Sequence, residues 1–306
     1  MNNSVSDIPQ PKPPGDIFSS TERIAMVSDL HFHTFYSNDA NNDPAVVLPI
    51  MARSGVSVIS STDHDALEAN ADFAALVGQY GIRHINGVEL DADHPEHGHL
   101  HILGYGFDVS HPDMIAYCER EQAAGKRFLD AVLDSMINDG YLTDMSVFEA
   151  WGKAVQPKRR LGLRHCWKWL SEKQAMSEDA AKEYVKAADA RGDKSYRCPH
   201  PAETIDVIRR AGGVAVFAHP ILIRYPDRME AVIDEILGLG AVGVEAYTPS
   251  NKTDEIIQQV AAIGRARGVL ITGGSDFHAS DGRVPEVWPS NAPDECGRDL
   301  LQILGL

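Results

Sequence analysis

The sequence predicts an α/β fold, a distorted (β/α)7 barrel interrupted by an inserted helical domain. Seven apolar runs of strand length recur along the chain, and most of them alternate with segments of helical periodicity. Each run ends at or near a residue that can bind a metal ion, and seven such endings in order are hard to reach by chance. In barrels of this kind the C-terminal ends of the strands form one face, on which the chemistry is built.

The seven strands are expected at residues 26–31, 56–61, 82–88, 99–105, 213–218, 242–247 and 269–273. Pro44 is typical of a helix start, and the helical spacing after it stops at Gly55. An alanine-rich helix is expected near 66–80, after the second strand. Only the polar segment 91–98 separates the third and fourth strands, so no helix fits there and the alternation breaks once. Later helices are expected at 201–211, 227–239 and 252–267.

Three parts are expected along the chain. Residues 1–21 are polar and rich in proline, which indicates a disordered leader. The barrel takes residues 22–108 and 201–306, and residues 109–200 form a helical insertion domain. The insertion contains no convincing strand, and its helical patterns lie near 111–139, 144–151, 162–174 and 177–191.

The composition limits the partners. With 28 basic and 44 acidic residues the formal net charge is −16, which argues against duplex nucleic acid but allows a small anionic substrate at a metal centre. The four cysteines are scattered without a CxxC pair, so we expect a reducing compartment and no thiolate zinc site. No run approaches the ~18 apolar residues of a membrane span, and the N-terminus lacks the apolar core of a signal peptide. We therefore expect a cytoplasmic protein without a membrane partner, of unknown oligomeric state.

Two pairs of candidate ligands are spaced two residues apart. In DLHFHT, the period of a strand points His31 and His33 the same way, so two imidazoles can share one metal. The alternative is a pair of half-buried histidines on a pleat, which is weak here because Asp29 and Thr34 frame the pair. Asp29 is expected to orient an imidazole of this pair. Asp276 and His278, in GGSDFH, repeat this spacing.

Single candidates end the other strands. His64 lies in TDHD, where Asp63 or Asp65 is expected to orient its imidazole; capping of the next helix is an alternative that can hold at the same time. Glu89, in NGVEL, carries a carboxylate that can bridge two metals. The remaining candidate ligands are His101 and His219, with His99 on the face of His101 as an orienting group. A loop or surface position is expected for His84, His94, His97, His111 and His200.

In order, the motifs DLHFHT, TDHD, GVEL, HILGYGF, AHP and GSDFH resemble those of the PHP (polymerase and histidinol phosphatase) family of metal-dependent phosphoesterases. The long insertion resembles that of the stand-alone bacterial members, which act on nucleoside 3′,5′-bisphosphates or short oligoribonucleotides. The resemblance implies two to three divalent transition metals, usually Mn, Fe or Zn. It implies a first metal held by His31, His33, Glu89 and Asp276, a second by Glu89, His101 and His219, and a third by His64, His278 and an aspartate of the first loop.

The first loop departs from the family pattern. The family usually has Ser-Asp-Gly here, whereas this chain has Ser37, Asn38, Asp39 and Ala40. In simple register the family aspartate falls on Asn38, whose neutral amide is a poorer ligand for a hard cation. A one-residue slip costs little in a loop, because no sheet register constrains it. We therefore expect Asp39 to be the ligand; the alternative is that Asn38 points inward and that the third metal site is weak or empty.

The candidate substrate contacts lie mostly in the insertion. The family has an arginine two residues before the insertion histidine, but here Leu163 takes that place and Arg164 adjoins His165. Arg164, His165 and Arg224 are expected to hold a substrate phosphate. The most basic stretch comprises Lys158, Arg159, Arg160, Arg164 and His165, for which a solvated helix start is an equal alternative.

These observations indicate a phosphatase, a metal-dependent hydrolase of small nucleotides such as nucleoside 3′,5′-bisphosphates, or of short oligoribonucleotides. A metal-activated hydroxide is the expected nucleophile. The residues expected at the reacting centre are Glu89, which bridges two metals, and His219 and His278, which orient or protonate. Two alternatives stay open: a histidinol-phosphate-type phosphatase, and a non-catalytic metal-binding regulatory module, against which the intact ligand set argues.

Overall fold

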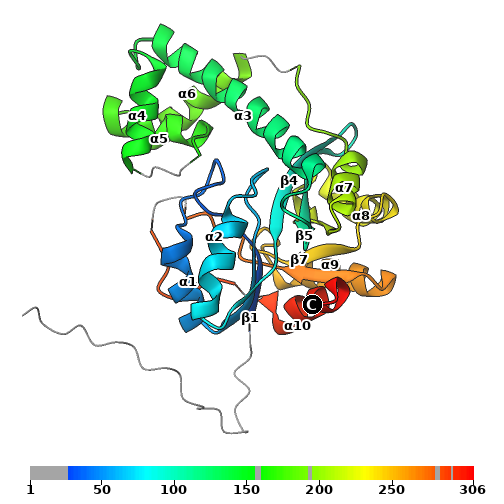
Figure 1. The fold of residues 1–306 in the computed structure, drawn as a ribbon. Helices are drawn as coiled ribbons and strands as arrows, with labels where there is room; N and C mark the ends of the chain where they lie inside the picture. The colour runs from blue at the N-terminus through cyan, green and yellow to red at the C-terminus, as the bar shows by residue number, and fades with distance from the viewer. Residues whose placement is uncertain (1–26, 156–159, 192–194, 280–282, 291) are drawn as a thin grey trace, which may run out of the picture.

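The computed structural model shows a mixed α/β molecule with two β-sheets at its centre and a group of helices at one end (Figure 1). It describes residues 27–155, 160–191, 195–279, 283–290 and 292–306. The leader expected at 1–21 therefore lies outside the described residues. No helix in the described chain is both long and apolar enough to cross a membrane.

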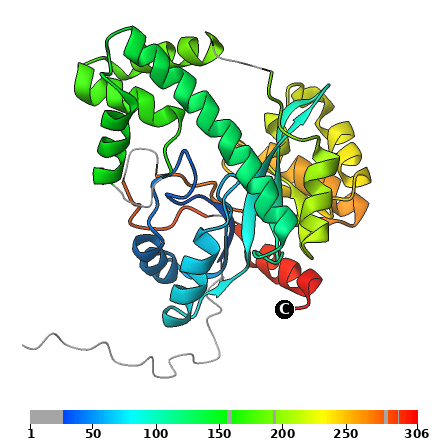
Figure 2. The same ribbon diagram turned by 45° about the horizontal axis from the view of Figure 1, so that its top comes forward.

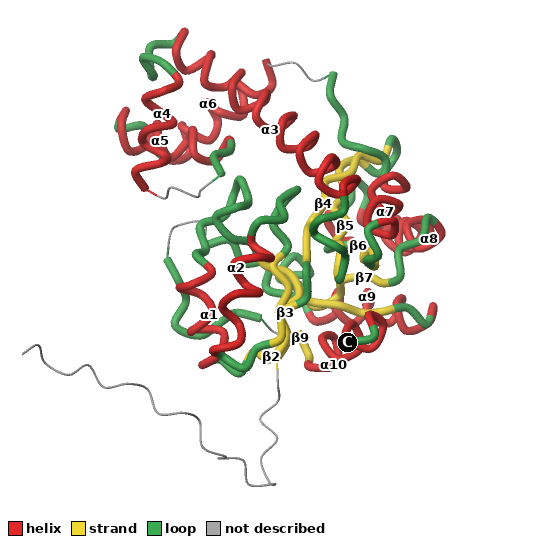
Figure 3. The backbone as a smooth tube through the Cα atoms, viewed as in Figure 1, coloured by secondary structure: helices red, strands yellow, loops and turns green. Residues whose placement is uncertain are grey.

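The first sheet has the strand order β3-β2-β1-β9. Figure 3 labels three of its strands, β2, β3 and β9. Its strands are β1 (Val27–Phe32), β2 (Val56–Ser61), β3 (Arg83–His84) and β9 (Ala292–Pro293). The first three run parallel, and β9 lies antiparallel along β1. Helices α1 (Pro44–Arg53) and α2 (Ala69–Leu76) lie beside this sheet, where Phe32, Ile59 and Phe73 are fully buried in a shared core.

The second sheet has the order β4-β5-β6-β7-β8. Its strands are β4 (Gly87–His94), β5 (Gly98–Tyr105), β6 (Val214–Phe217), β7 (Gly243–Tyr247) and β8 (Leu270–Gly273). The first three pair antiparallel, and the last three pair parallel. The helices α7 (Pro201–Arg210), α8 (Met229–Gly238) and α9 (Asp254–Arg267) contribute to its apolar core, and α10 (Asp294–Leu304) ends the chain.

The break in the alternation expected between the third and fourth strands is observed, but the strand boundaries differ. The strand expected at 82–88 is divided between the short β3 and the start of β4, and the segment 91–98, expected to be a loop, forms the ends and the turn of an antiparallel hairpin. Val88, Leu90 and Ala92 of β4 are buried on one face, because they alternate with acidic residues on the other. Because Asp91 and Asp93 make this part of the sequence polar, it resembles a loop although it forms the end of β4.

The two sheets meet at the C-terminal ends of β1 and β2. Isolated bridges join Phe32 to Phe277, beyond β8, and His64 to Glu89, at the start of β4. The Tyr105 hydroxyl of β5 donates to the Leu30 carbonyl oxygen of β1 at 2.8 Å. Strand ends that are far apart in the sequence are thereby brought to one place.

In the described part of the chain, four helices lie between β5 and α7: α3 (Pro112–Asn138), α4 (Met145–Val155), α5 (Leu163–Gln174) and α6 (Glu178–Arg191). Their own core includes Leu133, Phe148 and Trp169. Helix α3 runs from the second sheet to the other three helices in both views (Figures 1 and 2). Near its start, the Tyr117 hydroxyl donates to the Asp91 carbonyl oxygen of β4 at 2.9 Å. One helix therefore belongs to both cores and fixes the helical group relative to the sheets.

A second contact docks the helical group on the loop after β1. The Arg160 backbone nitrogen donates to the Phe35 carbonyl oxygen at 3.0 Å. Gly162, at the N-terminus of α5, lies so close to Asn38 that a Cβ added there would be 2.6 Å from the Asn38 carbonyl oxygen and 2.9 Å from its Cβ. Only glycine allows this approach without a shift of one segment.

We predict that Gly162→Ala loosens this contact. The overpacking should cost about 1–3 kcal/mol, which lowers the melting temperature by roughly 2–4 °C per kcal/mol, and proteolysis within α4–α6 should become faster. Gly125→Ala in α3 is the matched control, because the nearest atom to its added Cβ is the Arg160 Nη2 at an ordinary 3.7 Å. Equal melting temperatures and cleavage rates for the two variants would contradict the docking role of Gly162.

Candidate metal centre

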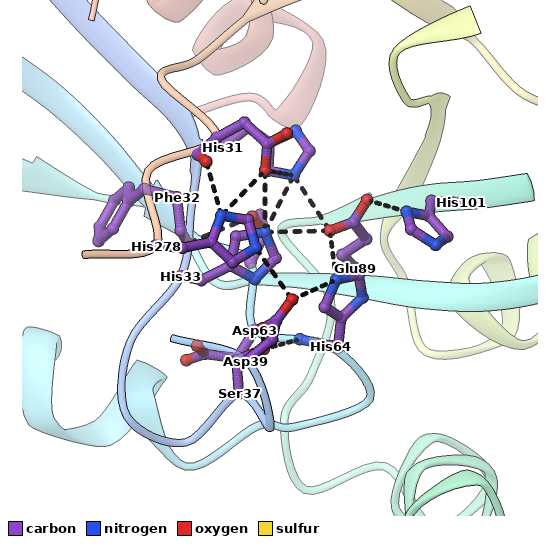
Figure 4. Close-up of polar contacts among 12 residues, drawn as sticks. His31, Phe32, His33, Ser37, Asp39, Asp63, His64, Glu89, His101 and His278 are labelled. Carbon is purple, nitrogen blue, oxygen red and sulfur yellow. Dashed lines mark hydrogen bonds and ion pairs between the residues drawn. The ribbon is translucent and has the colours of Figure 1, made fainter. Parts of the chain in front are cut away.

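The Glu89 carboxylate is the centre of the cluster at the strand ends (Figure 4). It is 1% exposed and lies near five imidazoles of the described chain. Its Oε2 is 3.1 Å from the Nε2 atoms of both His31 and His33 and 3.6 Å from that of His64. Its Oε1 is 2.8 Å from the His101 Nδ1 and 3.0 Å from the His219 Nε2. Each carboxylate oxygen thus faces a different set of imidazoles.

A second carboxylate faces the histidine pair of β1. The Asp276 Oδ1 is 3.5 Å from the His31 Nε2 and 3.3 Å from the His33 Nε2. The Asp276 backbone nitrogen donates to the His31 carbonyl oxygen at 2.7 Å, which holds the segment after β8 against β1. The pairs predicted at 31/33 and 276/278 therefore lie together.

The third set lies on the loop after β1. The Asp39 Oδ2 is 3.1 Å from the His278 Nε2 and 3.7 Å from the His64 Nε2, and the His33 ring stacks on those of His64 and His278. The neighbouring Asn38 lines a cavity under α3. The geometry therefore favours Asp39 over Asn38 as the acidic member of this set.

These groups fit divalent transition metals. Nitrogen and carboxylate oxygen atoms are the usual ligands of Zn, Mn and Fe. Imidazole nitrogens face each other at 3.3 Å in two places, between His31 and His33 and between His101 and His219, each time next to a carboxylate. A shared cation explains such convergence better than hydrogen bonding alone, because neutral imidazole has only one N–H. The donor sets within 4.8 Å include His33/Asp39/His64/His278, His31/His33/Glu89, His31/His219/Asp276 and His64/Glu89/His101.

The opposite charges of the carboxylates and imidazoles shift each other's pKa values towards the ionised forms. Burial alone raises the pKa of Glu89, but the neighbouring imidazoles, His31 first, hold that pKa well below its usual range. Burial lowers the pKa of His31, but the carboxylates of Glu245 and Glu89 raise it well above its usual range. Glu89 is therefore held in the ionised form that binds a cation, and a cation that binds His31 replaces the proton that this imidazole otherwise holds.

Two acidic residues for which no role was predicted orient the imidazoles. The Asp91 Oδ1 lies 3.2 Å from the His64 Nδ1 and 3.5 Å from the His101 Nε2, the nitrogens that point away from Glu89. The Glu245 Oε1 lies 2.9 Å from the His31 Nδ1. The sequence could have indicated a role for Asp91, because a residue two positions after Glu89 in a strand lies on the same face of the sheet.

The three aspartates expected to orient imidazoles bind other groups. Asp63 accepts hydrogen bonds from the backbone nitrogen and the hydroxyl of Thr34, and the Asp65 Oδ1 accepts from the Asp91 nitrogen at 3.3 Å. Asp29 accepts from the backbone and hydroxyl of Ser275 at 2.9 and 2.7 Å, and burial raises its pKa to about 6. Through these hydrogen bonds the three carboxylates position the segments that carry the candidate ligands.

Two of the histidines for which a surface position was expected are buried. His94 and His97 are 8% and 6% exposed, and their Nε2 atoms lie 3.0 and 2.8 Å from the two carboxylate oxygens of Glu235. His84 is partly buried and stacks on Phe73. His99 is half exposed, with its Nδ1 3.0 Å from the Asp93 Oδ1 and its Nε2 3.9 Å from the Asp91 Oδ1. His111 and His200 cap α3 and α7.

The residues predicted to contact the substrate lie in different environments. Arg164 is partly buried and close enough to Asp39 for the charge of that carboxylate to act on its pKa, which burial lowers. His165 is 1% exposed, and its Nδ1 accepts from the Gly162 nitrogen at 2.9 Å, which argues against a substrate contact. Arg224 is exposed at the β4–β5 turn, where its backbone donates to the His97 carbonyl oxygen. Lys158 and Arg159 lie outside the described residues.

A cavity of about 580 Å³ adjoins the cluster. Its lining includes Asp91 and Asp65 at the strand ends, Phe128 of α3, and Tyr196. Arg160 also lines it, and its Nη1 donates to the His64 carbonyl oxygen at 2.7 Å. The helical group therefore forms one wall of the space beside the metal-binding groups.

Comparison with known proteins settles the family. Residues 29–192 match the family model described as PHP domain. The chain belongs to the PHP family. It is accordingly a metal-dependent phosphoester hydrolase.

Three curated relatives act on different phosphate esters. A phosphoribosyl 1,2-cyclic phosphate 1,2-diphosphodiesterase of Eggerthella lenta is 27% identical over 276 residues, 86% of this chain and 98% of that protein. A 3′,5′-nucleoside bisphosphate phosphatase of Chromobacterium violaceum is 27% identical over 280 residues, 89% of this chain and 90% of its own. The 5′-3′ exoribonuclease Rnm of Escherichia coli is 27% identical over 273 residues, 85% of this PHP chain and 87% of its own.

Solved structures agree on the fold. A chain from Bifidobacterium adolescentis assigned as a metal-dependent phosphoesterase superposes with a TM-score of 0.74 at 22% identity, over 92% of this PHP chain and 97% of its own. An amidohydrolase from Chromobacterium violaceum, with bound sulfate and no metal, gives a TM-score of 0.68 at 23% identity, over 90% and 96%. Structural likeness at this identity extends to the fold alone.

We predict that Asp39→Asn weakens one metal site, whereas Asn38→Ala leaves the metal content unchanged. The reason is that Asp39 brings an anionic oxygen to His278 and His64, whereas Asn38 faces the cavity. Metal equivalents per chain should be measured after dialysis against a weak chelator. If Asp39→Asn matches the parent while Asn38→Ala loses a metal, the assignment to Asp39 is wrong.

Proposed function

We propose that this PHP protein hydrolyses phosphate monoesters of small nucleotides, of the nucleoside 3′,5′-bisphosphate type, or the ends of short oligoribonucleotides. The observation that carries the proposal is the set of donor groups around Glu89 at the edge of a cavity of about 580 Å³. A cavity of this volume lies within the range that accommodates small-molecule ligands. The bisphosphate phosphatase of Chromobacterium violaceum and the exoribonuclease of Escherichia coli, as named, lend support.

We propose that the donor groups hold two to three divalent metals. Glu89 would bridge the first two, because its two oxygens face different imidazoles. The first metal would be bound by His31, His33, Glu89 and Asp276, the second by Glu89, His101 and His219, and the third by Asp39, His64 and His278. Manganese, iron and zinc all suit this mixture of imidazole and carboxylate ligands.

Bound metals would supply an activated water and neutralise charge on the phosphate. The chain's own residues position the parts. The His278 Nδ1 donates to the Asp276 carbonyl oxygen at 2.7 Å, so its Nε2 presents a lone pair towards Asp39. This tautomer favours ligation over proton donation by His278. His219 would orient the reacting centre together with Glu89, and Arg164 and Arg160 would contact the substrate beyond the transferred phosphate.

We also propose the domain division on the basis of packing. Residues 22–108 and 201–306 would form one unit, in which the two sheets and the bridges between them make a distorted barrel. Residues 109–200 would form the insertion domain, supported by the separate core of α3–α6. This domain would narrow access to the metal centre.

The metal proposal predicts two to three transition-metal equivalents in the purified protein and loss of phosphate release on chelation. Added Mn²⁺ should restore the activity. His31→Ala should abolish turnover, because His31 faces both Glu89 and Asp276. Colorimetric phosphate release and elemental analysis provide the measurements. Activity that survives exhaustive chelation, with no metal detected, would remove the proposal.

The substrate proposal predicts a higher kcat/KM for nucleoside bisphosphates or very short oligoribonucleotides than for long strands, duplex DNA or histidinol phosphate. Arg164→Ala should raise KM more than it lowers kcat, the pattern of lost ground-state binding. Arg265→Ala, exposed on α9, is the charge-matched control and should leave both unchanged. A preference for histidinol phosphate would favour that alternative. Metal binding without turnover of any phosphate ester would favour a regulatory module.

A further inference from the structure

Glu245 is a fully buried carboxylate in the middle of an apolar strand. It is 0% exposed, and its neighbours on β7, Val244 and Ala246, are also fully buried. A carboxylate in such surroundings is costly unless its oxygens accept strong hydrogen bonds. Its two oxygens reach groups on β1 and in the turn after β6.

One oxygen of Glu245 binds the imidazole of His31. The Oε1 lies 2.9 Å from the His31 Nδ1, and the opposite ring nitrogen, Nε2, is the one that faces Glu89 at 3.1 Å. With a proton on Nδ1 donated to Glu245, neutral His31 has its lone pair on Nε2. The carboxylate therefore selects the tautomer that can bind a metal beside Glu89.

The other oxygen of Glu245 binds the backbone of His219. The Oε2 accepts from the His219 nitrogen at 2.9 Å. His219 has φ 23° and ψ 65°, a conformation that is strained for a residue with a side chain. This turn directs the His219 Nε2 to within 3.0 Å of the Glu89 Oε1. The hydrogen bond that the His219 nitrogen donates to Glu245 therefore stabilises the strained backbone that directs this imidazole to Glu89.

We propose that Glu245 is a positioning residue of the metal centre, which sets the tautomer of His31 and the backbone of His219. This inference rests on the proposed metal site. Glu245 would support these two residues and would not bind the metal itself, because both of its oxygens already accept hydrogen bonds. One carboxylate on β7 thereby aligns two proposed ligands, from β1 and from the turn after β6, that face opposite oxygens of Glu89.

Glu245→Gln tests the proposal because it keeps the shape but replaces one acceptor by a donor. If the amide oxygen serves the His219 nitrogen, the amide NH₂ faces His31 and moves its proton to Nε2, where it blocks the metal. If the oxygen serves His31, the NH₂ opposes the His219 N–H. Both outcomes should weaken metal binding by roughly 10–100-fold, the usual effect of losing such a partner.

The matched control is Glu235→Gln. Glu235 also binds two imidazoles through its two oxygens, those of His94 and His97, at the β4–β5 turn. Affinity for Mn²⁺ and Zn²⁺ should be measured by competition with a chelator, and the melting temperature of each chelated protein should be measured to separate folding from metal binding. Glu245→Gln should lose affinity, regain activity at high Mn²⁺ and keep most of its metal-free stability. Glu235→Gln should bind metal like the parent.

Equal metal affinity of Glu245→Gln and the parent would overturn the proposal. His31→Gln separates this failure from failure of the metal site itself, because a metal site at Glu89 requires that His31→Gln lose metal. If Glu245→Gln does not fold, ¹⁵N NMR of the zinc-loaded parent decides instead. The His31 Nδ1 should carry a protected proton and Nε2 the metal. An unprotonated Nδ1 would contradict the proposal.

Discussion

The arrangement of the strand ends depends on one buried carboxylate, that of Glu89. It is placed where β4 begins and where the bridge to His64 joins the two sheets. A lone carboxylate in this position would be strongly destabilised by desolvation, and it remains ionised because imidazoles surround both of its oxygens. Removal of the imidazoles would leave an uncompensated buried charge, so the histidine cluster and the central charge stabilise each other.

The supporting groups act in a second layer around this centre. Glu245 and Asp91 contact the nitrogens of His31, His64 and His101 that point away from Glu89. Asp29 and Asp63 hold the backbone of the segments that carry the ligands. The helical group completes the site from the other side, since Arg160 reaches the His64 carbonyl oxygen and Arg164 lies near Asp39. The candidate metal centre is thus enclosed on one side by helices that have a core of their own.

Most of the side chains that converge on Glu89 could be predicted from the sequence, because those at the C-terminal ends of β1, β2, β6 and β8 follow apolar runs of parallel strands. Glu89 and His101 lie instead within the antiparallel pair of β4 and β5. The two supporting carboxylates were harder to find. Asp91 lies in a polar segment that resembles a loop, and its role depends on the antiparallel pairing of β4 with β5. Glu245 was visible as a charge in an apolar strand, but its partners belong to β1 and the turn after β6, which only the packing of the sheet brings near.

The environments of several histidines also differ from those expected, because their partners could not be seen in the local sequence. His94 and His97 read as surface residues, but Glu235, from a helix far along the chain, covers them. His165 adjoins a basic stretch, yet it caps its own helix through Gly162. Burial of a polar side chain depends on partners that are distant in sequence, whereas the pattern of apolar runs is local.

The most direct test of the account is the anomalous diffraction of crystals soaked in Zn²⁺. We predict peaks ~2.0–2.1 Å from imidazole nitrogens, on both sides of the Glu89 carboxylate, with His31 and His219 bound through Nε2. A map without peaks around Glu89, from crystals in which the same side chains are ordered, would contradict the central claim.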